Sequence, residues 1–208
     1  MTDRGTAITS VAELEDIVGT PVQRVADKVR NELHELDREW LAGASLVFIA
    51  TSDADGNLDV SPKGDPAGFT KVLDATTIAI PDRPGNRRVD GFHNLLADPH
   101  IGLVFLIPGR GDTLRINGRA SIVRDAPFFD DMIVRGNRPD LALVVDIDEV
   151  FYHCSKAFLR SKAWDPSEWH PDSAPRRAVI AQSIERPDDP IETLDEYYGP
   201  KYEESIYG

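Results

Sequence analysis

The chain has 208 residues, of which 41% are hydrophobic and 8% aromatic, enough for one well-filled domain with terminal extensions. Lysine and arginine total 23 against 36 aspartates and glutamates, so the formal net charge is −13. A surface this acidic repels nucleic acid and anionic membranes, which excludes both as general partners. No signal peptide is apparent and no apolar run approaches the roughly 20 residues of a membrane span, so we expect a cytoplasmic protein.

The first predicted elements are helices. Residues 11–18 carry a short amphipathic pattern, and residues 20–41 carry a longer one with apolar residues three and four positions apart. Thr20 is a suitable N-cap for the longer helix, and Pro21 suits the first helical position. We expect these helices to cover a sheet, with residues 1–19 forming an N-terminal extension.

From residue 45 the pattern changes to β-strands joined by short turns. The predicted strands are 45–51, 57–61, 69–73, 77–80, 101–107, 112–123 and 141–154, and the predicted helices among them are 87–97, 126–136 and 155–164. Most strands are linked as hairpins, without regular alternation of strand and helix, so the sequence predicts a mainly β (α+β) fold. We expect an antiparallel barrel of six to seven strands with N-terminal and peripheral helices.

Residues 171–208 form a C-terminal arm of unusual composition. From residue 185 onward it is strongly acidic and punctuated by proline and glycine, a composition typical of disorder. It also contains Tyr197, Tyr198, Tyr202 and Tyr207, and amphipathic rings of this kind favour docking on a surface. We therefore expect a partly ordered arm.

The strongest functional signal is a basic turn in this acidic chain, "IPDRPGNRR" at residues 80–88. It lies where a predicted strand becomes a helix, with Asn86 as the candidate N-cap. Unpaired N–H groups at a helix start attract anions, and Arg83, Arg87 and Arg88 add cations suited to phosphate oxygens. The alternative is that these arginines pair with neighbouring aspartates on a solvated face. Taken alone, the turn supports both interpretations.

Two other strand ends carry polar groups. "SPKGD" places Ser61 and Lys63 at the end of one strand, and "TLRINGRA" places Arg115 and Asn117 on one face of another. If these strand ends converge with the basic turn, they form a pocket with a phosphate-binding end and polar groups for a ring.

The single cysteine, Cys154, follows His153 and raises the alternative of a thiol activated by a base. Because Cys154 ends a long apolar strand, we expect it to be buried and unreactive, while His153 remains a candidate to face a pocket. The other histidines lack the spacing of metal ligands, so no metal site is expected.

The order of these segments resembles the pyridoxamine 5'-phosphate oxidase-like family of FMN-binding split barrels. The segments are "SPKGD" (61–65), "IPDRPGNRR" (80–88), "ADPHIGLVFLIP" (97–108) and "TLRINGRA" (113–120). "HCSKAFLRSKAWDP" (153–166) further resembles the subgroup of FMN-dependent enzymes of unknown substrate. The resemblance covers residues 20–170. It implies a split barrel that binds FMN and forms a homodimer with the cofactor at the subunit interface.

The resemblance also implies a set of cofactor-binding positions. Asn86, Arg87 and Arg88 match the phosphate-binding positions, Ile80 and Pro81 match the strand end beside the flavin ring, and Asp82 follows them. Lys63 matches a lysine that ends the second strand. With Thr113, Arg115 and the neighbouring Ser61 from the same resemblance, and Arg83 from the charge of the basic turn, the full set of candidate cofactor-binding residues is Ser61, Lys63, Ile80, Pro81, Asp82, Arg83, Asn86, Arg87, Arg88, Thr113 and Arg115.

Two residues are weaker candidates for contacting the substrate, His153 and Trp164. Trp164 either roofs the flavin or packs as an edge residue. The chain lacks the Arg-x-His segment with which the oxidase holds its vitamin substrate, so oxidation of vitamin B6 phosphates is not expected. The leading hypothesis is an FMN-dependent oxidoreductase acting on an unknown small molecule. The alternatives are a flavin-binding protein without turnover, and a split barrel that uses a deazaflavin or haem.

Overall fold

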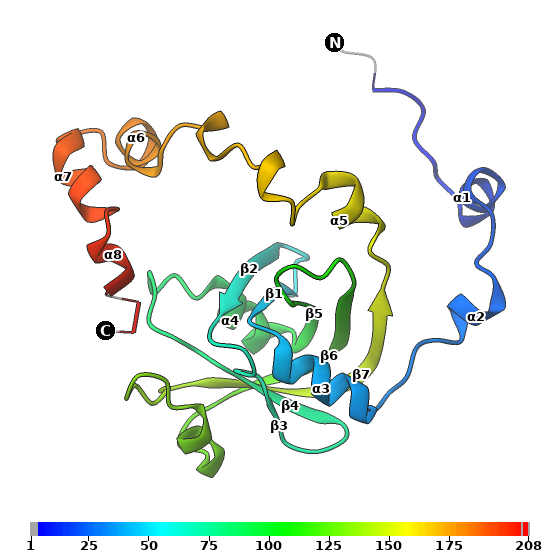
Figure 1. Cartoon of the computed structure of the whole chain (residues 1–208). Helices are drawn as coiled ribbons and strands as arrows, with labels where there is room; N and C mark the ends of the chain where they lie inside the picture. Colours follow the sequence, from blue (N-terminus) through cyan, green and yellow to red (C-terminus); the bar gives the residue numbers. More distant parts are fainter. Residues whose placement is uncertain (1–3, 205, 208) are drawn as a thin grey trace.

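The computed structural model describes residues 4–204 and 206–207; the ends of the predicted terminal segments, 1–3, 205 and 208, lie outside the described residues. Its centre is one strongly curled antiparallel sheet in the order β2-β1-β5-β6-β7-β4-β3 (Figure 1). The strands are β1 (Leu46–Ser52), β2 (Leu58–Gly64), β3 (Lys71–Val72), β4 (Thr77–Pro81), β5 (His100–Leu106), β6 (Thr113–Val123) and β7 (Ala142–His153). The expected mainly β split barrel is confirmed.

Helices flank the sheet and occur in both terminal arms. They are α1 (Val11–Val18), α2 (Gln23–Ala26), α3 (Glu35–Gly43), α4 (Asp90–Ala97), α5 (Lys156–Ser161), α6 (Arg177–Ile180), α7 (Ile191–Tyr197) and α8 (Lys201–Glu204). Short 3₁₀ turns cover Pro127–Met132, Pro166–Glu168 and Pro171–Ser173, and a π-helical turn covers Ala181–Glu185. No helix in the described part of the chain is both long and apolar enough to cross a membrane.

The hydrophobic core fills the inside of the curled sheet. Alternate side chains of the strands point inward, and Phe105, Leu114, Ile116 and Val145 are fully buried. Trp40 and Leu41 of α3 belong to the same core, as do Phe92 and Leu95 of α4, which packs against β1, β2 and β6. The interior of the barrel is therefore packed, and α4 is held firmly at one end of it.

One glycine is required where β6 and β7 bulge. The register of this pair shifts between Asn117 and Gly118. A Cβ atom at Gly118 would lie 2.1 Å from the carbonyl oxygen of Asp146, closer than any side chain permits. The bulge therefore depends on glycine and increases the local twist that curls the sheet.

The continuous helix predicted over residues 20–41 is wrong, because two separate helices, α2 and α3, form in its place. Between them the backbone of Arg30 pairs with Val150 of β7, donating at 3.1 Å and accepting at 2.7 Å. These hydrogen bonds to the barrel replace those of a continuous helix. A capping box between His34 and Asp37 then starts α3.

The helices predicted over 87–97 and 155–164 are shorter, as α4 and α5, and two other predicted elements are reduced further. The helix predicted over 126–136 is a 3₁₀ turn followed by a reversal in which Arg135 and Gly136 have positive φ angles. The strand predicted over 69–73 is reduced to β3, which lies at the edge of the sheet and pairs only with β4. Both segments are turns or edges, where tertiary contacts decide the boundaries.

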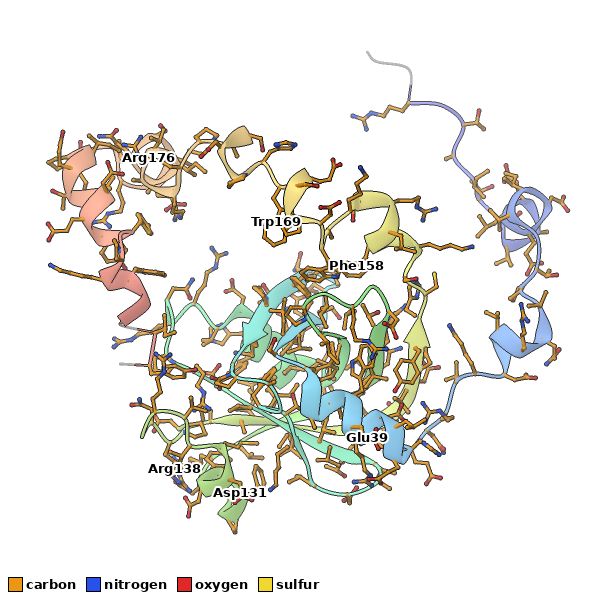
Figure 2. All side chains as sticks on the ribbon, in the orientation of Figure 1. Glu39, Asp131, Arg138, Phe158, Trp169 and Arg176 are labelled. Atoms are coloured by element: carbon orange, nitrogen blue, oxygen red, sulfur yellow. The ribbon has the colours of Figure 1, made fainter. Side chains whose placement is uncertain are left out.

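The two arms leave the barrel in different ways (Figures 1 and 2). The N-terminal arm projects away from it, and α1 has no buried residue. The C-terminal arm forms a small cluster of its own from Ala178, Ala181 and Leu194, and returns to the barrel at its end. Tyr197 contacts both Tyr198 and Tyr202 in this arm.

Candidate functional site

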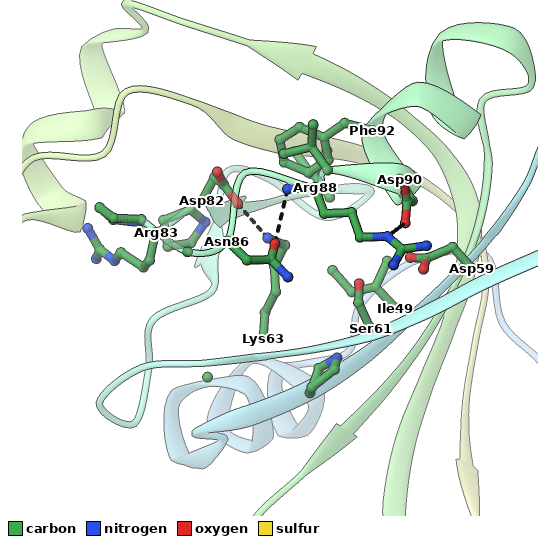
Figure 3. A pocket seen from close by; sticks show the side chains of 18 of the residues that line it. Ile49, Asp59, Ser61, Lys63, Asp82, Arg83, Asn86, Arg88, Asp90 and Phe92 are labelled. Atoms are coloured by element: carbon green, nitrogen blue, oxygen red, sulfur yellow. Dashed lines mark hydrogen bonds and ion pairs between the residues drawn. The ribbon is translucent and has the colours of Figure 1, made fainter. Parts of the chain in front are cut away.

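A cavity of about 820 Å³ opens at the end of the barrel next to α4 (Figure 3). Its size lies within the roughly 300–1,000 Å³ of cavities that bind cofactors and small ligands. The apolar part of its wall includes Ile49, Phe69, Phe92, Leu95 and Leu143. Its polar part comes from β2, the end of β4 and the loop of residues 82–89.

Most of the predicted cofactor-binding residues lie together in this cavity. Its lining includes Ser61, Lys63, Pro81, Asp82, Arg83, Asn86, Arg87 and Arg88. Ile80 does not line it, because this side chain is fully buried in the core. The basic turn and the "SPKGD" strand end therefore converge, whereas the "TLRINGRA" strand does not reach the cavity, and the ligand stays a prediction.

The loop of residues 82–89 has an unusual backbone. Arg87 and Val89 have φ angles of 61° and 44°, in the left-handed region that residues other than glycine rarely adopt, β-branched residues such as valine least of all. Asn86 does not cap α4, which begins at Asp90 rather than at Arg87; its side-chain oxygen instead accepts the N–H of Arg88 at 3.0 Å. Strained backbone of this kind persists only where its surroundings fix it, and it concentrates at ligand-binding sites.

Three of the four cations in the cavity wall are paired with acids. Lys63 Nζ lies 2.5 Å from Asp82 Oδ1. Arg88 donates to Asp90 across an exposed loop. The side chain of Arg87 makes no hydrogen bond or ion pair with the described residues. Of the cavity's cations, Arg87 is therefore the one immediately available to an anion.

Arg83 has a structural role in this arrangement. Its Nε donates to Asp65 at 2.6 Å, and its two terminal nitrogens donate to the carbonyl oxygens of Met132 and Asn137 at 2.7 and 3.2 Å. In Figure 3 it extends away from Arg88. Arg83 therefore ties the loop to the barrel, and its donors are already used.

Several polar residues of the cavity were not predicted from the sequence, among them Thr51 and Asp59. A Cβ atom at Gly91 would lie 3.1 Å from Asp59 Oδ2 and 3.4 Å from Thr51 Oγ1, so glycine lets the first turn of α4 approach β1 and β2. Asn94 of the same helix donates to Thr51 Oγ1 at 3.1 Å. Gly91 lies inside the helix predicted over residues 87–97, and a glycine within a helical pattern is a sequence signal for such a close approach.

Besides Ile80, four predicted site residues lie outside the cavity: Thr113, Arg115, His153 and Trp164. Thr113 is buried opposite His153 in the β6–β7 pair, and the guanidinium of Arg115 lies 5.0 Å from the ring of Phe151. Trp164 stacks on a neighbouring phenylalanine and its ring N–H donates to a backbone carbonyl at 2.7 Å. One chain alone therefore does not bring these residues to the cavity.

Comparison with known protein families identifies the family to which this barrel belongs. Residues 33–154, which run from the start of α3 past the end of β7, match the pyridoxamine 5'-phosphate oxidase family. The chain belongs to this family. No curated protein matches it.

Several solved structures are similar to this member of the pyridoxamine 5'-phosphate oxidase family. HupZ from Group A Streptococcus is 19% identical over 58% of this chain and 94% of its own, with a TM-score of 0.46. An FMN-binding protein from Syntrophomonas wolfei is 16% identical over 57% of this chain and 89% of its own, with a TM-score of 0.42. An F420 reductase is 16% identical over 56% of this chain and 94% of its own, with a TM-score of 0.40.

The described residues contain no group of three or more histidine, cysteine, aspartate or glutamate side chains arranged around a metal ion. None of the chain's five histidines lines the cavity, so it offers no imidazole to a haem iron.

The prediction that Cys154 is buried is wrong: β7 ends one residue earlier, and the thiol is exposed.

Proposed function

We propose that the cavity binds FMN and that the protein is an FMN-dependent oxidoreductase acting on a small molecule. The observation that carries this proposal is that one cavity has both an apolar wall and, on its rim, Arg87, which has no partner among the described residues. The chain that contains this cavity belongs to the pyridoxamine 5'-phosphate oxidase family. FMN matches this arrangement, because it has a largely apolar ring system at one end and a phosphate at the other.

The residues present fit this cofactor. Arg87 and Arg88 lie on the rim, where guanidinium groups suit phosphate oxygens. Arg88 is 77% exposed, so exchanging Asp90 for a phosphate costs little desolvation. Phe69 and Phe92 provide apolar surface for a ring system.

The chain's contribution to the reaction is binding and orientation. Lys63, whose Nζ lies 5.1 Å from the ring centre of Phe92, places a positive charge beside the apolar wall. Asp82 holds that ammonium group in position, and Ser61 adds a hydroxyl on the same strand. When bound, FMN supplies hydride or electron transfer, and the protein orients the substrate against it.

We further propose that two chains assemble as a homodimer around the cofactor. Thr113, Arg115, His153 and Trp164 lie outside the cavity of one chain, and a second copy is the natural source of such contacts. The outer face of β1 and β2 supports this, because Phe48, Leu58 and Val60 are 39%, 79% and 63% exposed. Sedimentation equilibrium measures the assembly, and a monomer at all concentrations would contradict it.

The first test of the proposed function is titration of the purified chain with FMN, followed by flavin absorbance and fluorescence. We expect saturable binding, and absence of binding would overturn the proposal. Reduction of the bound flavin by NADH or NADPH is measured next. Tight binding without any reduction or substrate oxidation would leave a flavin-binding protein and remove the oxidoreductase.

The phosphate end is tested by a double variant, Arg87→Ala with Arg88→Ala. We expect the Kd for FMN to rise well over tenfold, since each charge-assisted hydrogen bond contributes about 1.5–3 kcal/mol. The matched control is Arg124→Ala with Arg160→Ala, two exposed arginines outside the cavity. Unchanged affinity in the first variant would place the phosphate elsewhere.

A further inference from the structure

The C-terminal end of the chain returns to the cavity. The hydroxyl of Tyr207 donates to Asp65 Oδ1, and the other oxygen of this carboxylate accepts from Arg83. The guanidinium carbons of Arg83 and Arg135 lie 5.7 and 5.4 Å from the centre of the Tyr207 ring. Chain ends are usually poorly ordered unless contacts hold them, so this set of contacts sets Tyr207 apart.

The acceptor of this hydrogen bond, Asp65, is a buried carboxylate held in a fixed position. The Asp65 side chain is only 1% exposed, and the Arg83 that pairs with it is anchored to two backbone carbonyls of a neighbouring turn. A tyrosine hydroxyl that binds such a carboxylate meets a rigid, charged partner. The bond to Asp65 and partial burial raise the pKa of Tyr207, so the hydroxyl stays protonated and able to donate at neutral pH.

The residue before Tyr207 forms part of the cavity itself. Ile206 lines it together with Asp65, Arg83 and the loop of residues 82–89, although it lies more than a hundred positions later in the sequence. Ile206 is 45% exposed, so it stands at the edge of the cavity wall. The docking of Tyr207 therefore sets where Ile206 stands in the wall.

We propose that the C-terminal end is a strap across the cavity, with Tyr207 as the fastening residue at Asp65 and Ile206 as the residue that narrows the opening. This inference rests on the proposed flavin site, and it adds that ligands enter and leave more slowly while the strap is fastened. Asp65 and Arg83 then hold the wall closed; they are positioning residues and do not contact the reacting atoms.

Docking of the strap is tested without any flavin. Carboxypeptidase Y is added to the full chain, and release of residue 207 is followed by mass spectrometry and normalised to synthetic peptides of the same C-terminal sequence. Tyr207→Phe keeps the ring but loses the bond to Asp65, so we expect release about tenfold faster, the effect of about 1.4 kcal/mol from a charge-assisted hydrogen bond. Equal normalised rates in the two proteins would overturn the strap.

The matched control is Tyr197→Phe, which removes another tyrosine hydroxyl from the same arm. This hydroxyl has no hydrogen-bond partner among the described residues. We expect its release rate to equal that of the unchanged chain. Faster release in both variants would show that the arm loosens as a whole, which would overturn the specific role of Tyr207.

Ligand passage is tested by stopped-flow binding of FMN. Deletion of residues 206–208 and Tyr207→Phe are both expected to raise the association and dissociation rates severalfold, whereas Tyr197→Phe leaves them unchanged. Unchanged rates after the deletion would overturn the strap while leaving the flavin site intact. Failure of every protein to bind FMN would overturn the proposed function, and the carboxypeptidase result would still decide whether the chain end docks.

Discussion

Two arginine–aspartate pairs in this chain share their chemistry and differ in their surroundings. Asp37 is 1% exposed and accepts two bonds from Arg30 and a third, at 2.7 Å, from the N–H of His34. Arg88 is 77% exposed and reaches Asp90 only two positions along the chain. The buried pair fixes where α3 begins, whereas the exposed pair leaves its cation exchangeable. Burial therefore separates an ion pair that builds the fold from one that can serve a ligand.

The largest effect is expected from breaking the buried pair. Asp37→Ala leaves Arg30 without its partner and removes half of the capping box, so we expect the free energy of unfolding to fall by about 3 kcal/mol. Urea unfolding followed by circular dichroism measures this change. The control is Glu35→Ala in the same helical turn, where an exposed carboxylate should cost less than about 0.5 kcal/mol. Equal effects would mean that burial does not distinguish the two sites.

Acid should remove most of the same contribution. Burial of the Asp37 carboxyl opposes its ionisation, but hydrogen bonds from Arg30 and from the His34 backbone outweigh burial and hold its pKa below the usual 3.8. The folded state therefore favours the charged form, and this stabilisation is full above the ordinary pKa and is lost as the pH falls through the lower folded value. The difference in unfolding free energy between the unchanged chain and Asp37→Ala should narrow below about pH 4. A constant difference would contradict this assignment.

The smallest effect is expected from opening the exposed pair. Asp90→Asn removes an anion from the rim and frees Arg88, so FMN should bind about threefold more tightly, in line with the 0.2–1 kcal/mol typical of exposed pairs. Fluorescence titration measures the Kd. Asp98→Asn at the other end of α4 is the control, because Asp98 lies outside the cavity. Weaker binding by Asp90→Asn would mean that Asp90 itself holds the ligand or the loop.

Much of the barrel could be predicted because its signals are local. Alternating strands such as β6 and β7 and the amphipathic α1 appear at the expected positions. The helix predicted over residues 20–41 failed because the backbone of Arg30 bonds to β7, a contact more than a hundred positions away that no helical pattern contains. Cys154 was misjudged for a related reason, since the apolar pattern of β7 does not show that the strand ends before it.

Many of the residues that line the candidate cavity could be predicted from the sequence, but what each of them does there could not. Charge and turn residues correctly brought Lys63 and Arg87 to one cavity, because strand ends and the loops that follow them share one end of a barrel. The sequence could not show that the Arg83 guanidinium donates to Asp65 and to two backbone carbonyls, because these partners come from distant segments. The same limit hid Ile206, which reaches the cavity from the other end of the chain.

The place where Tyr207 docks has a practical consequence for handling the protein. An affinity tag fused after residue 208 would begin two positions beyond Tyr207, the residue that docks at Asp65 in the cavity wall. The N-terminal arm projects away from the barrel, so a tag there adds nothing near the cavity (Figure 1). Preparations tagged at opposite ends should therefore differ in cofactor content after purification, and the end that carries the tag belongs in the design of every binding experiment.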